Sequence, residues 1–223
     1  MAKVILFDFW GTIVENGVWS PVKQVKNILR IDLPFSEYVV RMEKAMMTSQ
    51  FSELKEAFVK VGEEFGITIS PRQMENLIGT WNKSWMLAWP YKEAEAALTE
   101  LQKDYRLALV SNTDCFSTPK VLEKYGLKKY FEHTFLSYEQ GKIKTDPEMF
   151  EDILKEMGVK AEECVMVGDS LQSDMLPAQQ QGMMAVLVDR RGTREFPVKI
   201  KSLEELKPLL EGKEENSETE EVK

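Results

Sequence analysis

The sequence has few residues that could hold zinc or form disulfide bonds. It contains two cysteines and one histidine among 223 residues. Cys115 and Cys164 belong to no Cys-x-x-Cys or Cys/His cluster, so no zinc site is expected. Cys164 lies in an apolar run, which favours a buried free thiol over a functional one.

Signatures of membrane and nucleic-acid binding are also missing. No apolar stretch approaches the roughly 20 residues that a membrane span needs. The chain begins without a signal-peptide pattern, and no basic stripe with interleaved aromatic residues indicates a nucleic-acid partner. We therefore expect a cytoplasmic protein that binds neither membranes nor nucleic acids.

The net charge of −8 is concentrated near the end of the sequence. Residues 211–223 carry six acidic and two basic side chains, a net charge of −4, and show no apolar periodicity. Such a composition predicts a disordered acidic tail rather than a charged surface on a folded domain.

Three short apolar runs each end in residues that can carry chemistry. Asp8 follows residues 4–7, Ser111 follows residues 107–110, and Gly168-Asp169 follows residues 164–167. Continuous apolar runs of this length are typical of strands buried on both faces. Helical patterns separate them, so the sequence predicts an α/β fold with a Rossmann-like core built on a parallel sheet.

One stretch interrupts this alternation of strands and helices. Residues 17–89 contain four helical patterns and no strand between them, which predicts an all-helical cap domain inserted after the first strand. The core then comprises residues 1–16 and 90–210. At helical spacing within the insertion, Trp81 and Trp85 are predicted to lie in the core of the bundle.

The strand ends predict a metal site. Carboxyl ends of parallel strands share one edge, where ligands of open α/β sheets bind, so Asp8, Ser111 and Asp169 should meet there. Asp174 follows near the start of the next helix, where it could also be an ordinary helix-start acid. Carboxylates about 4 Å apart repel by roughly 4 kcal/mol at a protein-like dielectric, so they need a cation or raised pKa values. Oxygen ligands in small number fit Mg²⁺.

A lysine extends this cluster toward phosphate chemistry. Lys144 supplies a cation, and Ser111 lies among backbone N–H donors, so the set suits a phosphoryl group attacked by a carboxylate. Taken alone, Lys144 would be interpreted as a solvated loop lysine and Asp8 as the start of a turn.

Four segments, in this order, resemble the motifs of the haloacid dehalogenase-like (HAD) hydrolases. They are Asp8-Phe-Trp-Gly-Thr, Leu-Val-Ser111-Asn, Lys144-Thr-Asp-Pro-Glu-Met-Phe and Val-Gly-Asp169-Ser-Leu-Gln-Ser-Asp174. The resemblance covers residues 3–15 and about 90–190. The inserted helices fall where that family carries a helical cap, although they share no motif with it.

The resemblance implies a metal and a nucleophile. Asp8 would attack the substrate phosphorus and become an aspartyl-phosphate. Mg²⁺ would be held by the Asp8 carboxylate, the backbone carbonyl of Trp10 and Asp169, with Asp174 supporting the site.

The same resemblance implies the groups that bind substrate. Ser111, Asn112 and Thr12 would bind the transferring group, and Lys144 would neutralise charge between nucleophile and substrate. Lys142 is the competing assignment, but Lys144 has the expected distance in sequence to the Asp-Pro pair that follows.

Trp10 departs from the pattern of the family's phosphatases, which usually carry a second aspartate at this position. That aspartate protonates the leaving group and later activates water, and an indole can do neither. Loss of a general acid–base typically lowers the rate by roughly 10²–10⁴-fold, so weak activity is expected.

Other functions stay open because of Trp10. The 2-haloacid dehalogenases usually carry an aromatic residue at this position, but those enzymes need no metal and lack the counterpart of Asp169. Phosphonate-cleaving relatives keep the metal and use a cap lysine. A non-catalytic binding or regulatory protein on a HAD scaffold is a further alternative.

The favoured function is a Mg²⁺-dependent hydrolase that releases phosphate from a small phosphorylated metabolite through an aspartyl-phosphate on Asp8. His133, at the edge of a short strand, is expected to be structural rather than a replacement acid. The reach of Glu15 toward the site, the identity of the substrate and the oligomeric state are not predicted.

Overall fold

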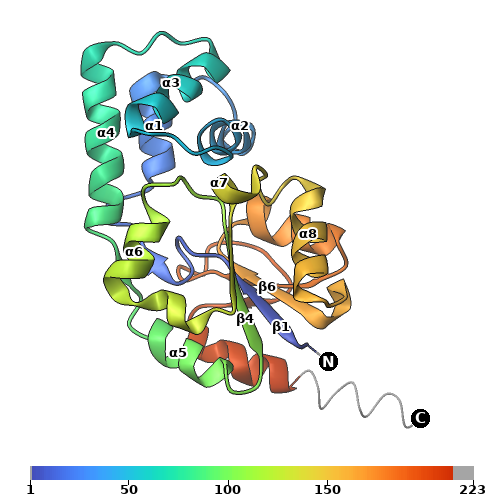
Figure 1. The fold of residues 1–223 in the computed structure, drawn as a ribbon. Coiled ribbons are helices and arrows are strands. Elements are labelled where there is room, and N and C mark those ends of the chain that lie inside the picture. The colour runs from blue at the N-terminus through green and yellow to red at the C-terminus, as the bar shows by residue number, and fades with distance from the viewer. Residues whose placement is uncertain (1, 213–223) are drawn as a thin grey trace.

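A six-stranded parallel sheet forms the centre of the molecule (Figure 1). The computed structural model describes residues 2–212. The strand order is β5-β4-β1-β6-β7-β8. Their bounds are β1 Val4–Phe7, β4 Arg106–Ser111, β5 His133–Leu136, β6 Cys164–Gly168, β7 Met184–Val188 and β8 Lys199–Ile200. The predicted α/β class with a parallel sheet is therefore confirmed.

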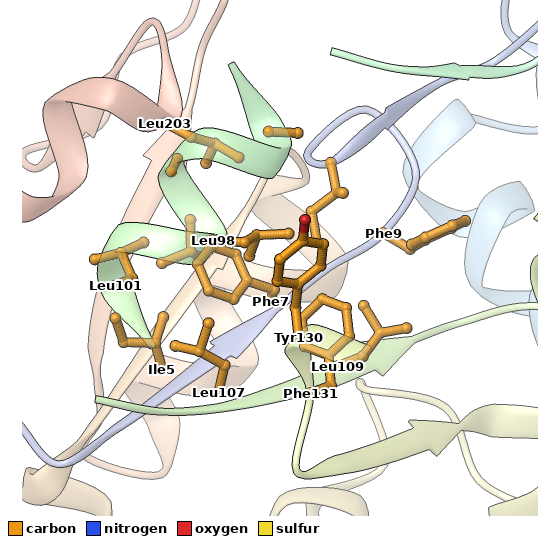
Figure 2. Packing of buried hydrophobic residues seen from close by; sticks show 14 of the residues in the cluster. Ile5, Phe7, Phe9, Leu98, Leu101, Leu107, Leu109, Tyr130, Phe131 and Leu203 are labelled. Atoms are coloured by element: carbon orange, nitrogen blue, oxygen red, sulfur yellow. The ribbon is translucent and has the colours of Figure 1, made fainter. Parts of the chain in front are cut away.

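Apolar side chains on both faces explain why the first strand lies in the middle. All four residues of β1 are fully buried. Alternate residues point to opposite faces, so Ile5 and Phe7 pack with Leu98 and Leu107 on one side (Figure 2). Other β1 residues, such as Leu6, pack against the opposite cluster. A strand that is buried on both faces needs apolar residues at every position, and the sequence of β1 provides them.

Helices cover both faces of the sheet. On the face shown in Figure 2 lie α5 Ala94–Leu101, α6 Thr118–Tyr125 and the 3₁₀ helices Leu127–Tyr130 and Leu203–Glu205. On the other lie α8 Pro147–Met157 and α9 Leu176–Gln180. Short turns of helix at α7 Ser137–Gln140 and Ala161–Glu163 each precede a loop or strand.

Four helices above the sheet have a core of their own (Figure 1). They are α1 Pro21–Leu29, α2 Phe35–Met47, α3 Leu54–Phe65 and α4 Pro71–Met86. Tyr38, Phe58 and Trp81 are among the buried side chains that hold them together. We call residues 17–89 the helical insertion.

A two-stranded antiparallel ribbon forms the root of the helical insertion. Its strands are β2 Val14–Glu15 and β3 Trp89–Pro90, so the chain leaves the sheet and returns to it side by side. This pairing joins the insertion to the core by two adjacent segments.

The insertion helices begin with different kinds of cap. Ser70 forms a complete capping box with Gln73 at the start of α4. Ser20 precedes α1 with a left-handed backbone and no side-chain cap. The second helix begins at Phe35, one residue before Ser36, because Pro34 occupies the capping position.

The two tryptophans predicted to lie in the core of the bundle, Trp81 and Trp85, differ in what they contact. Trp81 is buried in the core of the insertion, and its indole N–H donates to Asp114 at 2.8 Å. Trp85 is only partly buried and packs against the sheet-side cluster instead, so its prediction as bundle core was wrong. The predicted tail at 211–223 lies outside the described residues, apart from its first two positions.

The Trp81–Asp114 hydrogen bond should contribute to stability. Asp114 follows β4, so this buried, charge-assisted bond ties the insertion to the sheet. Trp81→Phe keeps most of the packing and removes the donor, which should lower the free energy of unfolding by about 1.5–3 kcal/mol in urea titrations. Trp85→Phe, whose indole bonds Asn82 on its own helix, is the matched control and should cost less than about 1 kcal/mol. Equal losses would contradict this role for Trp81.

Candidate active site

Three carboxylates meet at the carboxyl edge of the sheet. Asp8 follows β1, Asp169 follows β6, and Asp174 lies in the next turn. Oxygen atoms of the three side chains lie within 4.8 Å of one another. The apolar runs predicted that Asp8 and Asp169 would meet here, since the carboxyl ends of parallel strands share one edge. Asp174, which could have been an ordinary helix-start acid, joins them.

Irregular backbone brings Asp174 to this edge. Residues Leu171–Met175 form a π-helical turn, wider than an α-helical one. The N–H of Ser170 donates to the Asp174 carboxylate at 2.9 Å and fixes its direction. A Cβ at Gly168 would lie 2.3 Å from an Asp174 oxygen, so only glycine leaves room for the carboxylate.

A second glycine brings the first loop against Asp169. Gly11 has a φ of 78°, which favours glycine, and a Cβ there would lie 2.6 Å from an oxygen of Asp169. The loop that follows Asp8 can therefore pass directly over the Asp169 carboxylate.

Lys144 lies between two of the carboxylates. Its Nζ is 2.6 Å from Asp8 Oδ1 and 2.5 Å from Asp174 Oδ1, and the side chain is only 2% exposed. Its backbone N–H donates to Asn112 at 2.9 Å. Lys142, the competing lysine, instead pairs with Asp152 nearer the surface. The interpretation of Lys144 as a solvated loop residue is therefore wrong.

The cluster carries more negative charge than Lys144 can balance. Burial, opposed by Lys144 and supported by Asp174, raises the pKa of Asp8 to about 6. Burial and the charges of Asp8 and Asp174 raise the pKa of Asp169 to about 8. Burial lowers the pKa of Lys144, but the two carboxylates beside it outweigh that effect and raise it. Three carboxylates thus share one ammonium, and the site favours further positive charge.

The predicted substrate-binding residues differ in how far they are already engaged. Ser111 Oγ is buried and has no hydrogen-bond partner within residues 2–212, which is unusual for a buried hydroxyl. Thr12 Oγ1 donates to Asp8 Oδ2 at 3.2 Å and so orients the proposed nucleophile. Asn112 donates from its amide to Glu43 of the helical insertion at 2.8 Å.

The ring of Trp10 lies against the start of α6. Its indole N–H donates to Thr118 Oγ1 at 3.0 Å, and Thr118 shares a second hydrogen bond with Thr113 at 2.7 Å. The ring also packs edge-on against Phe9. The side chain is therefore held by the neutral hydroxyl of Thr118 and offers no acid to the site.

A cavity of about 650 Å³ opens above the carboxylates, between the sheet edge and the helical insertion. Its lining includes Asp8, Lys144 and Asp169 below and Trp19 and Glu43 from the insertion. A space of this size accommodates a small metabolite.

Sequence reasoning missed Glu43 as a member of this cavity. It lies on α2 among the inward positions Val39, Met42 and Met46, at the spacing that makes one helix face. An acid on an apolar face was the available signal. Glu15, whose reach was not predicted, also lines the cavity and accepts a hydrogen bond from Tyr91.

The single histidine lies at the opposite end of the sheet from the carboxylates. His133 is the first residue of β5, whereas the site forms at the carboxyl ends of the strands. Its ring stacks on Phe135 and bonds Glu156 at 3.1 Å, in agreement with the structural role expected for it.

Comparison with known proteins identifies the family. Residues 2–182 match the family model of the haloacid dehalogenase-like hydrolases. The chain belongs to the HAD hydrolases. A glyceraldehyde 3-phosphate phosphatase of Methanothermobacter thermautotrophicus is 28% identical over 200 residues, which cover 85% of this chain and 86% of that protein. The predicted family, and a phosphatase-like hydrolase within it, are thus confirmed.

Solved structures of HAD enzymes share this architecture. A HAD phosphatase from Thermococcus onnurineus matches with a TM-score of 0.61 at 25% identity, over 93% of this chain and 97% of that one. A 2-haloacid dehalogenase from Pseudomonas syringae pv. Tomato DC3000 matches with a TM-score of 0.64 at 20% identity, over 94% and 98%. The second likeness concerns the fold alone. Within residues 2–212, no helix is both long and apolar enough to cross a bilayer.

The buried ammonium of Lys144 should contribute to the stability of the fold as well as to catalysis. Lys144→Met leaves three carboxylates facing one another, which should lower the free energy of unfolding by about 3–5 kcal/mol in metal-free buffer. Lys142→Met removes an exposed pair two residues away and should cost less than about 1 kcal/mol. Urea titrations of both variants measure the difference, and a Lys144→Met chain as stable as Lys142→Met would contradict the buried pairing.

Proposed function

We propose that this HAD hydrolase is a Mg²⁺-dependent phosphatase that cleaves a phosphate monoester of a small metabolite through an aspartyl-phosphate on Asp8. The observation that carries this proposal is the cluster of Asp8, Asp169 and Asp174 around the single ammonium of Lys144. The likeness to a glyceraldehyde 3-phosphate phosphatase over most of the chain supports the same reaction class.

The donor set fits a divalent cation. When all three carboxylates are ionised, they exceed the one ammonium among them by two negative charges, and oxygen donors in small number suit Mg²⁺. The Asp8 and Asp169 carboxylates and the Trp10 carbonyl would hold the ion, with Asp174 supporting them. When bound, it would offset the charge of the phosphate oxygens and of the nucleophile.

The residues of the chain perform the two half-reactions. Asp8 attacks phosphorus with the oxygen that Thr12 does not hold, and the bond from phosphorus to the ester oxygen breaks. Lys144 offsets the charge between carboxylate and phosphate. The unpartnered hydroxyl of Ser111 donates to a phosphoryl oxygen. Water then hydrolyses the aspartyl-phosphate, which restores Asp8 and releases phosphate.

This arrangement favours phosphate over carbon–halogen chemistry. A dehalogenase that works without metal has no use for Asp169 beside the nucleophile, because the charges of Asp8 and Asp169 repel each other. A purely regulatory protein, in turn, has no need of a buried serine hydroxyl left without a partner at the sheet edge. The cytoplasmic location stays a prediction.

Removal of the nucleophile should abolish turnover. Asp8→Asn keeps the shape of the side chain but not its charge, so release of p-nitrophenolate from p-nitrophenyl phosphate should fall by at least about 10³-fold. Asp152→Asn, on the exposed part of α8, is the matched control and should keep wild-type rates. Normal turnover by Asp8→Asn, or chloride release from chloroacetate in the presence of a chelator, would reject the proposal.

Metal binding can be measured without turnover. Mg²⁺ at about 100 times its dissociation constant should raise the free energy of unfolding by about 2.7 kcal/mol, since the ion binds only the folded cluster. Asp169→Asn should lose most of this stabilisation, whereas Asp152→Asn should retain it. Denaturant titrations with Mg²⁺ or with chelator provide the measurement. Equal stabilisation of both variants would show that the ion binds elsewhere.

A further inference from the structure

The proposed reaction needs a proton that no residue of the loop after β1 supplies. The oxygen of an alkyl phosphate ester leaves as a poor, strongly basic alkoxide unless it is protonated as the bond breaks. Position 10 carries an indole that donates its N–H to Thr118 and has no carboxyl to offer. The proton donor must therefore come from another element that reaches the cavity.

Glu43 is the carboxyl group that the helical insertion contributes to this cavity. It lies on α2, is partly buried and lines the space above Asp8 and Lys144. One oxygen, Oε2, accepts from the Asn112 amide at 2.8 Å. Its other oxygen accepts no hydrogen bond from any side chain or backbone group of the described chain, and no lysine or arginine there forms an ion pair with it.

Asn112 links this carboxyl to the reacting groups. Its amide nitrogen donates to Glu43, and its amide oxygen accepts from the backbone N–H of Lys144 at 2.9 Å. Lys144 in turn contacts Asp8. A single asparagine side chain thus spans the distance from the insertion to the residue beside the nucleophile, and it leaves Oε1 of Glu43 available to a substrate.

The surroundings of Glu43 favour a carboxyl that can both give and take a proton near neutral pH. Burial raises its pKa to about 7, against the hydrogen bond from Asn112 and the charge of Lys144. Asp174 and Asp8 face it across the cavity and raise the pKa further. Burial and the charge of Glu43 raise the pKa of Tyr38, which lies on the same helix.

We propose that Glu43 is the general acid and base of the phosphoryl transfer, supplied by the helical insertion in place of an acid at position 10. This rests on the proposed phosphatase function. Glu43 then contacts the leaving oxygen of the substrate directly, so it is a catalytic residue and not a positioning one.

The proton balance closes over one cycle. In the first half, the bond from Asp8 to phosphorus forms, the ester P–O bond breaks, and its electron pair takes the Glu43 proton to give the alcohol. In the second half, the Glu43 carboxylate removes a proton from water as the water oxygen bonds to phosphorus. The Asp8–phosphorus bond breaks with its electrons on Asp8, phosphate leaves, and Glu43 is protonated again.

The contacts of α2 explain how the acid is held over the site. Ser137 donates from its hydroxyl to the carbonyl of Met47 at 2.6 Å, and Lys44 pairs with Asp146 at 2.9 Å. The two contacts join the end of α2 to the first residue of α7, directly after β5, and to the residue before α8. Glu43 therefore reaches the cavity only while the insertion lies against the sheet edge.

Leaving-group dependence tests this role. Glu43→Gln keeps an acceptor for Asn112 and removes the acid. With an alkyl phosphate that the wild-type chain hydrolyses, kcat should fall by about 10²–10⁴-fold. With p-nitrophenyl phosphate, whose leaving group needs no proton, the variant should show a burst of about one p-nitrophenolate per active site, then slow turnover as the aspartyl-phosphate accumulates. Glu37→Gln, exposed on the same helix, should behave as wild type.

The pH profile provides a second readout. For the alkyl phosphate, kcat/KM of the wild-type chain should fall as pH rises above about 7, because Glu43 then loses its proton, and Glu43→Gln should lack this limb. Equal losses on both substrates without a burst, or no loss, would overturn the role of Glu43 and leave the proposed phosphatase intact. Absence of any phosphatase activity in the wild-type chain would instead reject the proposed function itself.

Discussion

The pairing of one buried ammonium with three converging carboxylates is the interaction on which the site depends. Lys144 contacts Asp8 and Asp174 directly, whereas the Asp169 carboxylate forms no ion pair within residues 2–212 and feels the charges of Arg194 and Lys144 without contact. At an effective dielectric near 20, each pair of charges about 4 Å apart contributes roughly 4 kcal/mol of attraction or repulsion. The cluster therefore exists only because the surrounding fold holds the carboxylates together. Its excess negative charge favours a divalent cation, which would in turn offset the repulsion between the carboxylates and a phosphate.

The fold supplies that constraint through strands that are buried on both faces. Fixed register between β1 and β6 pairs Phe7 with Val167, so Asp8 and Asp169 emerge at nearly the same height. Glycines at positions 11 and 168 then remove the Cβ atoms that would keep the carboxylates apart. Apolar packing beneath the edge, shown in Figure 2, thus stabilises an arrangement that the charges alone would oppose.

Features determined by local sequence could be predicted, whereas features determined by packing between distant segments could not. The strands and Asp8, Asp169 and Lys144 could be predicted because apolar runs and motif spacing are local signals, and topology brings strand ends together. The partner of Trp85 could not be predicted, since it depends on how the insertion packs against the sheet. Glu43 could not be assigned for the same reason: helical spacing reveals an acid on an apolar face but not what that face covers.

The tryptophan at position 10 and the glutamate at position 43 have one common explanation. An acid in the loop after β1 would be present whether or not the insertion lay over the site. An indole there, held by Thr118, is fixed and inert, so the proton must arrive with α2. Chemistry would then require the insertion to contact the sheet edge, because only this contact places Glu43 to protonate the leaving group and later to activate water. On this argument Trp10 does not mark a decayed enzyme but one whose acid has moved to the element that closes the site.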